Sequence, residues 1–246
     1  MLPLAKMYSV LTFAENNQLF KQLAGVYDEL PQTSCQMCGT CCANPRPASF
    51  MEYVNVYRYV RDNLADLHQE IVKKAIAFFF LELVDADIKC PFLGKDDRCL
   101  IYPVRPLSCR AFGILADGEH DIFVPNMAAV AEQYQKEYGI TLPDEVVNFT
   151  LPACGDIKLE KGQKVNAEFL ERQLLKCLAL DSRFVPPDLA FEQRVTMMPL
   201  AKHLAATVLN EGIRAKRPDV MKEYLENGGS SLLLDKFVAR GERFSF

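Results

Sequence analysis

The sequence contains nine cysteines, and their number and spacing make them the residues most suited to carry its chemistry. Four of them stand together in the segment Cys35-Gln-Met-Cys38-Gly-Thr-Cys41-Cys42. Two cysteines with two residues between them can turn both thiolates toward one metal centre, and Gly39 permits the positive φ that such a bend needs. Four thiols this close together are hard to explain by packing alone. The segment therefore predicts a metal site with thiolate ligands.

Four isolated cysteines downstream complete the set. The residues that follow Cys90 and Cys154, a proline and a glycine, suit turns that carry metal ligands. Adjacent residues usually project their side chains in different directions, so Cys41 and Cys42 could serve two neighbouring centres. Eight thiols are enough for two all-cysteine sites of four ligands each. The expected metal ligands are Cys35, Cys38, Cys41, Cys42, Cys90, Cys99, Cys109 and Cys154.

The ninth cysteine is expected to lie in the core. Cys177 shares a helical face with leucines 170, 174 and 178, where a buried cysteine behaves as a small hydrophobe. A disulfide framework is not expected, because the cysteine count is odd and residues 1–20 lack the apolar stretch of an export signal. In a reducing cytosol, clustered thiols more often bind metal. We therefore expect a soluble, cytoplasmic protein.

The all-thiolate ligand set limits which metals could bind here. Thiolate ligands alone are typical of iron–sulfur clusters and of structural zinc. A zinc ribbon would show two C-x2-C knuckles, and only the first is present here. Successive C-x2-C spacings instead match the way bacterial ferredoxins wrap a cubane, with the fourth ligand distant in sequence. The expected cofactor is one or two [4Fe-4S] clusters. Spacing does not identify a metal, so zinc and a metal-free protein stay as alternatives.

Two blocks of the sequence resemble the YkgJ-type CxxCxxCC family of zinc- or iron-chelating cysteine-cluster proteins. The first block is the tetrad, and the second contains Cys90-Pro-Phe-Leu and Cys99-x-Ile101-Tyr102-x2-Arg105-Pro106-x2-Cys109-Arg110. The likeness covers roughly residues 35–112 and is specific, because both blocks occur in order. It implies that the seven cysteines of these blocks chelate a metal or cluster, whereas Cys154 is our own addition. The family includes flagellin lysine N-methylases, which adds a methyltransferase that uses S-adenosylmethionine to the alternatives.

Three other residues of the second block are candidates for the cofactor site, namely Tyr102, Arg105 and Arg110. The two arginines could donate hydrogen bonds to cluster sulfurs, offset the thiolate charge or hold an anionic substrate group. An arginine beside an irregular loop could equally bond backbone carbonyl groups and fix the loop. Both interpretations stay open at this point.

The remaining composition limits the class of protein. The 246 residues are 50% hydrophobic and 24% charged, which is typical of a globular chain with a sizeable core. A net charge of −4, without a strongly basic segment, argues against nucleic acid as a partner. The most apolar run, 75–84, contains Glu82 and is too short to cross a bilayer, so no membrane association is expected. The partner that remains is a protein, for example a redox partner.

The elements that position the thiols are expected to be mostly helical. Helical periodicity predicts helices at 20–27, from the N-cap Ser49 to 64, and onward to 84. Further helices are expected at 126–139, 166–180, 191–210 and 219–226. Residues 35–48 show no periodicity and indicate an irregular loop. Two short hairpins are expected, one around 94–97 and one at Asp117-Gly118 with arms 113–116 and 122–124.

These patterns predict a mainly α fold with a small irregular or β cysteine-rich core, in which helices pack around metal-organised loops. Pro186-Pro187 suggests a helical metal-binding domain, 1–185, followed by a C-terminal helical cap, 186–246, on the same core. The expected function is metal binding with a redox or enzymatic role, the enzyme being a cluster-dependent oxidoreductase. A protein-lysine N-methyltransferase and a structural zinc module that presents a surface to a partner are the alternatives. No catalytic residue is identified, because no nucleotide-binding, metalloprotease or radical-adenosylmethionine motif occurs.

Overall fold

The computed structural model describes residues 4–43, 46–119, 121–150, 154, 157–184 and 197–246, and it is mainly α-helical with a small β content, as the sequence predicts. The α-helices of this part are α1 (Leu4–Asn16), α2 (Leu19–Asp28), α3 (Phe50–Asn63), α4 (His68–Leu81), α5 (Leu107–Ala111), α6 (Met127–Tyr138), α7 (Asp144–Val147), α8 (Ala167–Asp181), α10 (Leu200–Leu209), α11 (Arg217–Glu226) and α12 (Leu232–Gly241). Short 3-10 helices are η1 (Thr40–Ala43), η2 (Ala65–Leu67), η3 (Tyr102–Val104) and η4 (Glu211–Lys216). The strands are β1 (Gln32–Ser34), β2 (Pro47–Ala48), β3 (Lys158–Lys161) and β4 (Met198–Pro199).

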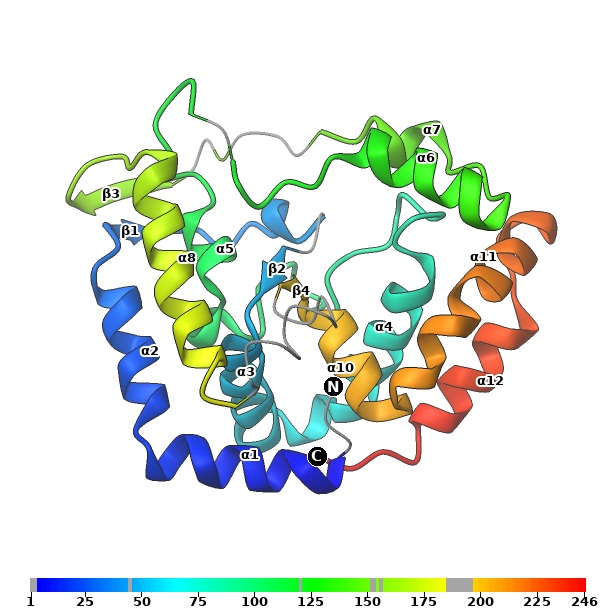
Figure 1. Ribbon diagram of the computed structural model, residues 1–246, viewed down its shortest axis with the longest axis horizontal. Helices are drawn as coiled ribbons and strands as arrows, with labels where there is room; N and C mark the ends of the chain where they lie inside the picture. The colour runs from blue at the N-terminus through cyan, green and yellow to red at the C-terminus, as the bar shows by residue number, and fades with distance from the viewer. Residues whose placement is uncertain (1–3, 44–45, 120, 151–153, 155–156, 185–196) are drawn as a thin grey trace.

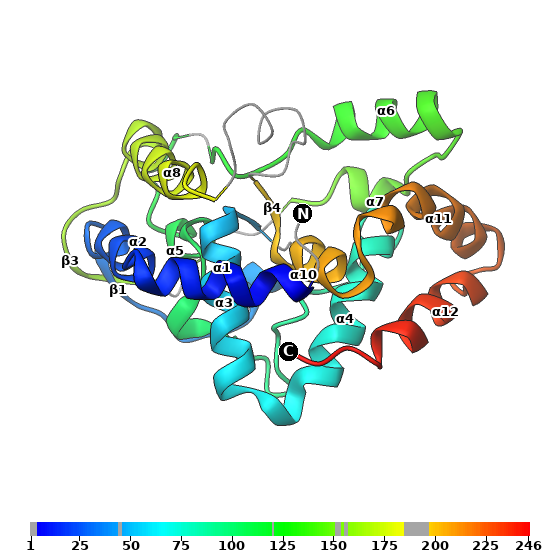
Figure 2. The same cartoon turned by 60° about the horizontal axis from the view of Figure 1, so that its bottom comes forward.

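The helices form two groups with the cysteine-rich loops between them (Figure 1). Helices α1, α2, α3 and α8 make one group, and α4, α10, α11 and α12 make the other, an arrangement that a second view keeps (Figure 2). In the first group, helix α3 packs on α8 and on α2. In the second group, both α10 and α12 pack on α4. Helix α10 also contacts α3 and so links the two groups. The buried apolar side chains form one continuous cluster that includes Tyr53, Phe80 and Leu204. The two groups therefore share one core.

The start of α3 is fixed by its own sequence and by α8. The Ser49 hydroxyl accepts the N–H of Glu52 at 3.3 Å, and the Glu52 carboxylate accepts the N–H of Ser49 at 2.8 Å. This reciprocal capping box satisfies two amides that a helix start leaves free. Asp181, at the end of α8, accepts the next two amides, Phe50 at 2.8 Å and Met51 at 2.7 Å. The helix that follows the cysteine tetrad is thus anchored at its first residue.

Two small antiparallel sheets join segments that are distant in the sequence. Strand β1 pairs with β3, with Ser34 opposite Lys158, and β2 pairs with β4, with Ala48 opposite Met198. Strand β1 ends directly before Cys35 and β2 begins directly after Arg46. The two sheets therefore hold both ends of the segment that carries the tetrad.

Several predicted helices are confirmed, with their caps. The predicted 20–27, 126–139, 166–180 and 219–226 correspond to α2, α6, α8 and α11. Asn126 accepts the N–H of Ala129 at 3.1 Å and Gly139 ends α6 with φ 66°, as expected of these residue types. The stripe predicted to continue to 84 is interrupted by η2 before α4 begins. Helices α1 and α12 were not anticipated.

The hairpin predicted at Asp117-Gly118 is wrong. Leu115 forms a parallel bridge with Val165, and the N–H of Ala116 donates to the carbonyl of Val165 at 2.8 Å. Residues 122–124 form a turn rather than a strand. The first predicted hairpin has a counterpart, because Leu93 bridges Cys99 in antiparallel fashion and Gly94 N donates to Arg98 O at 2.8 Å.

The proposed boundary at Pro186-Pro187 lies outside the described residues, as do positions 191–196 of the helix predicted over 191–210. The described part of that helix is α10, which begins at Leu200 and packs on α4. The division into a metal-binding domain and a cap therefore stays a prediction.

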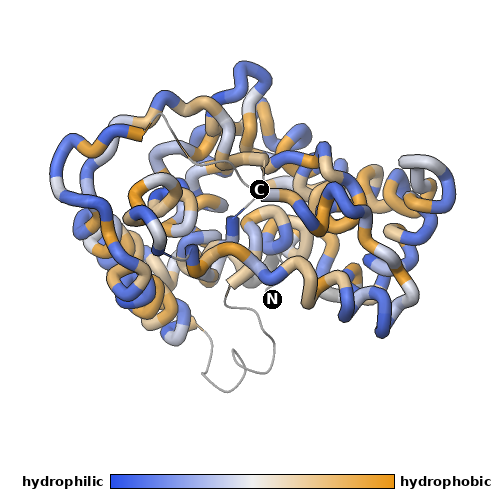
Figure 3. Tube along the Cα trace, turned by 90° about the horizontal axis from the view of Figure 1, so that it is seen from above, coloured by the Kyte–Doolittle hydropathy of each residue, from blue (hydrophilic) through white to orange (hydrophobic). Residues whose placement is uncertain are grey.

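Polar and apolar residues alternate along the chain (Figure 3). Helix α8 is an example, since Leu170 and Cys177 are buried while Glu171 and Arg172 are exposed. Within the described residues, no helix combines the length and the apolar composition that crossing a bilayer requires.

Candidate metal centre

Eight thiols from separate parts of the chain line one cavity of about 60 Å³. They are Cys35, Cys38, Cys41, Cys42, Cys90, Cys99, Cys109 and Cys154. The rest of the wall is largely apolar and includes Ile101, Phe112, Ile157 and Leu200. None of the nine cysteines forms a disulfide. All eight expected metal ligands thus lie around one space.

The tetrad wraps the cavity through one tight bend. Gly39 has φ 75°, and a Cβ at this position would lie 2.9 Å from the carbonyl oxygen of Asp97. The N–H of Cys42 then closes a turn on the carbonyl of Gly39 at 2.8 Å. The sulfur of Cys35 accepts the N–H of Met37 at 3.4 Å. The segment 35–42 therefore has the backbone conformation and the N–H···S contact that a thiolate-binding turn requires.

The second cysteine block is bonded to the first through its backbone. The N–H of Cys90 donates to the carbonyl of Cys42 at 2.9 Å. The chain then turns at 94–97 and returns, so that the bridge between Leu93 and Cys99 brings the next thiol back to the same wall. Backbone contacts alone therefore gather Cys42, Cys90 and Cys99.

Cys109 lies on the short helix α5, whose position is set by buried polar contacts. The first amide of α5, Leu107 N, donates to the Glu52 carboxylate at 2.5 Å, and Tyr27 donates to the same oxygen at 2.8 Å. The next residue, Ser108, donates its hydroxyl to the carbonyl of Pro47 at 2.5 Å. Helix α5 is thereby fixed to α2, α3 and β2 at once.

Cys154 reaches the cavity because β3 pairs with β1. The pairing places Lys158, the first residue of β3, opposite Ser34, which precedes Cys35. Gly113 makes room for this approach, since a Cβ there would lie 2.9 Å from the Cβ of Cys154 and 2.8 Å from Ile157. Cys154 is thus held near the tetrad by tertiary contacts alone.

The thiol of Cys42 is the hub of the cluster. It contacts the thiols of Cys41, Cys90 and Cys99, and these contacts raise the pKa of Cys42. The contact with Cys42 lowers the pKa of Cys41 and of Cys99, and Arg105 lowers both further. Burial raises the pKa of Cys109. The surroundings of Cys41 and Cys99 therefore favour their thiolate form, which is the form that binds metal.

The three polar candidates of the second block take different positions. Tyr102 and Arg105 line the cavity, with the guanidinium carbon 4.1 Å from the ring centroid. The Nε of Arg105 is buried and has no hydrogen-bond partner among the described residues. Arg110 donates instead to the carbonyls of Arg105 and Pro103, both at 2.8 Å, and is not part of the cavity wall. Arg110 thus fixes the loop, whereas Arg105 faces the thiols' cavity.

Arg46 also lines the cavity, and it is a residue that the motif analysis did not single out. It stands after the tetrad, outside both cysteine blocks, so spacing offered no signal for it. Its side chain bonds Asp121 at 2.5 Å, and its Nε has no partner among the described residues. Arg46 and Arg105 therefore each present a buried N–H donor that no described residue satisfies.

Cys177 lies apart from the cavity. It is fully buried in the apolar core, on the face of α8 that also carries Leu170 and Leu180. Burial raises the pKa of its thiol. This is the position expected of a small hydrophobe.

In the part of the chain that the structure describes, no group of three or more His, Cys, Asp or Glu side chains is already arranged to hold a single metal ion. The thiols instead stand around the walls of the cavity.

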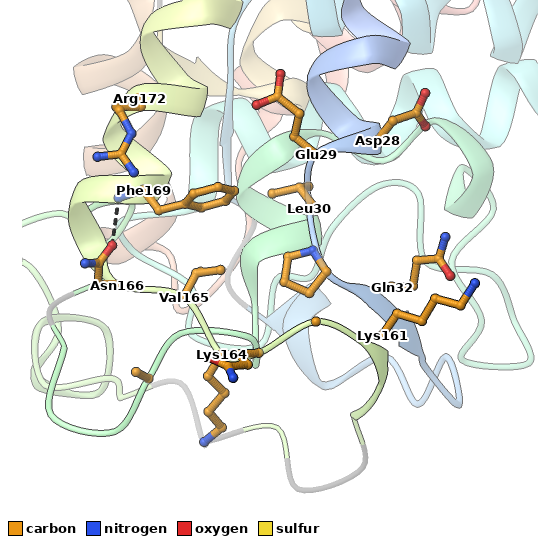
Figure 4. A pocket seen from close by; sticks show the side chains of 14 residues that line it. Asp28, Glu29, Leu30, Gln32, Lys161, Lys164, Val165, Asn166, Phe169 and Arg172 are labelled. Carbon is orange, nitrogen blue, oxygen red and sulfur yellow. Dashed lines mark hydrogen bonds between the residues drawn. The ribbon is translucent and has the colours of Figure 1, made fainter.

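A second, larger hollow of about 670 Å³ lies between the end of α2, the strand β3 and the start of α8 (Figure 4). Three of its charged side chains are engaged in ion pairs within the chain. Glu29 bonds Lys176 at 2.5 Å, Lys164 bonds Asp117 at 2.6 Å and Arg172 bonds Glu168 at 2.6 Å. No cysteine belongs to its wall.

Comparison with known families identifies the part of the chain that contains both cysteine blocks as a metal-binding region. Residues 34–134 match the sequence model of the CxxCxxCC family, whose description is "Putative zinc- or iron-chelating domain". The match confirms the resemblance drawn from the two cysteine blocks and contains seven of the eight cavity thiols, with Cys154 beyond its end. Comparison with curated proteins and with solved structures finds no match.

Proposed function

Because residues 34–134 of this chain match the sequence model of the CxxCxxCC family, which is described as a zinc- or iron-chelating domain, we propose that the thiols of this cavity hold one or two [4Fe-4S] clusters that work in electron transfer. The observation that carries this proposal is the single cavity lined by all eight thiols. One structural zinc ion takes four ligands, so eight thiols call for more than one metal atom. An iron–sulfur cluster distributes its thiolates over several irons.

The other residues of the wall suit such a centre. Ile101, Phe112 and Ile157 place apolar surface beside the thiols, and the N–H of Met37 is bonded to the sulfur of Cys35 at 3.4 Å. The unsatisfied N–H donors of Arg46 and Arg105 supply positive charge beside the thiolates. A bound cluster would supply one-electron chemistry, and the protein's own groups would set how readily it accepts the electron. Electron exchange requires a redox partner protein, and a reducing cytoplasm keeps the thiols available.

Metal and sulfide analysis of protein purified under argon tests the proposal. We expect brown protein with broad visible absorption, iron and acid-labile sulfide in similar amounts, and reversible bleaching by a reductant. A colourless protein that contains zinc and neither iron nor sulfide would overturn the iron–sulfur assignment and favour a structural zinc module. A brown protein whose absorption does not change with reductant would overturn the electron-transfer role.

The family's link to lysine N-methylases makes methyl transfer the alternative activity. The thiol-lined cavity, about 60 Å³, is well below the ~300–1,000 Å³ of typical small-molecule sites, so S-adenosylmethionine would need another place. Calorimetric titration with S-adenosylmethionine distinguishes the two. Saturable binding would favour a methyltransferase, and its absence in metal-loaded protein would leave electron transfer.

A further inference from the structure

Arg46 is a buried cation at the wall of the thiol cavity. Arg46 is only 6% exposed, and it lines the cavity together with the eight thiols. A cation this deeply buried requires compensating negative charge.

The guanidinium is held rigidly from one side. Asp121 bonds its Nη2 at 2.5 Å, and the Asp121 carboxylate also accepts the N–H of Phe123 at 3.0 Å. The rings of Phe112 and Phe123 flank the guanidinium, with centroids 5.6 Å and 5.7 Å from its central carbon. Strand β2 begins at the next residue and is paired with β4. The arginine is thus preorganised by its neighbours.

One donor of this rigid group remains unsatisfied. The Nε of Arg46 is buried and has no hydrogen-bond partner among the described residues. A buried donor without a partner loses its hydrogen bond to water and gains none in return, so such a group normally signals a partner that completes it. Sulfur anions on the cavity wall are acceptors of the right charge.

We propose that Arg46 donates its Nε–H to a sulfur of the bound metal centre and raises the centre's reduction potential, while Asp121 orients the guanidinium and tempers its charge. This role rests on the proposed iron–sulfur function. Arg46 acts through the centre and is therefore a positioning and tuning residue. Removing the charge of Asp121 should therefore shift the reduction potential in the direction opposite to removing Arg46. A merely structural contact would not produce this opposition.

The test compares reduction potentials under anaerobic conditions. Arg46→Met removes the charge and the donor, and we expect its potential to fall by an amount equal to at least a tenfold change in the redox equilibrium, about 59 mV for one electron. Asp121→Asn keeps an oxygen for Arg46 and removes the negative charge, so its potential should rise. Arg46→Lys keeps the positive charge, so its reduction potential should lie between those of the wild type and Arg46→Met.

Arg58→Met is the matched control. Arg58 also stacks on a phenyl ring, 3.7 Å from the centroid of Phe20, but does not line the cavity. Its potential should equal that of the wild type. Unchanged potentials in both Arg46 variants, or shifts of the same sign in Arg46→Met and Asp121→Asn, would overturn the role of Arg46 while leaving the cluster intact. Should Arg46→Met fail to fold, Arg46→Lys and Asp121→Asn carry the test.

A wild-type protein that holds zinc without iron would overturn the proposed function, and Arg46 is then tested by chelator competition. A donor to a zinc-bound thiolate should make Arg46→Met lose zinc at a chelator concentration at least tenfold lower than wild type or Arg58→Met. Equal zinc retention in all three proteins would overturn the inference in that case.

Discussion

The backbone N–H of Cys90 donates a hydrogen bond to the carbonyl oxygen of Cys42 over 2.9 Å, although the two residues stand in different cysteine blocks. Their thiols are in contact as well, and Cys99 joins them. The polypeptide thus brings the two blocks together through its own backbone. A metal centre at this place would bind thiols that the backbone has already brought together from both blocks.

Metal removal should loosen this arrangement locally. The segments 35–43 and 88–106 contain little regular structure of their own, so their amides depend on the thiol cluster for protection. We expect the amides of Cys42 and Cys90 to exchange at least tenfold faster in chelator-treated protein. Hydrogen exchange measured by mass spectrometry checks this, with α10 as the internal control. Equal exchange in both states would show that the cluster does not organise these loops.

Replacing the hub thiol should cost the metal. Cys42→Ala removes the sulfur that contacts three other thiols, and we expect most of the bound metal to be lost. Cys177→Ala is the control, because Cys177 is equally inaccessible but lies in the apolar core. It should keep its metal and lose roughly 1 kcal/mol of stability. Metal loss in Cys177→Ala would contradict the assignment of that cysteine to the core.

Gly39 should be intolerant of any side chain. Gly39→Ala combines a left-handed backbone, about 1–2 kcal/mol, with a Cβ only 2.9 Å from the backbone oxygen of Asp97. We expect reduced metal content and a lower melting temperature. Gly139→Ala has a similar φ of 66° but meets nothing within 4 Å, so it should cost only about 1–2 kcal/mol for the left-handed backbone and keep the metal. Similar metal content in both variants would contradict the close approach at Gly39.

Glu52 should be important for the position of Cys109. Its buried carboxylate accepts from Leu107 N, Ser49 N and Tyr27, and burial raises the pKa of Glu52. Glu52→Ala leaves these donors without an acceptor, and we expect a loss of roughly 3 kcal/mol in unfolding free energy together with reduced metal content. Glu168→Ala, which removes an exposed ion-pair partner of Arg172, should cost less than about 1 kcal/mol. Denaturant titration separates the two, and equal losses would contradict the anchoring role.

His203 should contribute an acid-dependent loss of stability. The ring is fully buried against Tyr53, and burial lowers the pKa of His203 to about 4, below its ordinary 6.5. The folded state therefore keeps the ring neutral, so the contribution is complete above about pH 6.5 and is lost as the pH falls toward 4. The shift corresponds to about 3 kcal/mol.

The measurement is the unfolding free energy between pH 4 and pH 7 in the wild type and in His203→Gln, whose amide can still donate to the carbonyl of Ala48. Burial raises the pKa of Asp181 to about 7, which acts with opposite sign in the same range but is common to both proteins. We expect the difference between the two profiles to grow with pH. Parallel profiles would show that His203 does not titrate in this range.

Helices with strong local signals were predictable. Ser49 with Glu52, Asn126 with Gly139, and Asn166 each satisfy free backbone groups at a helix end from within a few residues. Helix α12 also begins at an N-cap, because the Ser231 hydroxyl accepts the N–H of Leu234 at 3.0 Å, and the prediction missed this signal. The helix packs against α4, where a Cβ at Gly241 would lie 2.2 Å from Ile76. Its packing against α4 is a long-range contact that the local pattern does not encode.

The hairpin at Asp117-Gly118 failed for the same reason. The dipeptide does form a turn, but Leu115 bonds to Val165 instead of to the arm that follows the turn. A local hairpin and a distant strand segment compete for the same amides, and the sequence pattern around the turn does not contain the competitor.

The sequence by itself determined the chemistry of the ligands, because thiols and their C-x2-C spacing are covalent properties of the segment 35–42. The tertiary structure decided which other groups meet them. It brought Cys154 to the cavity through the pairing of β1 with β3, turned Arg110 to backbone carbonyls and placed Arg46 at the wall. Those positions depend on contacts between segments far apart in the chain, and long-range packing leaves no local trace in residue spacing.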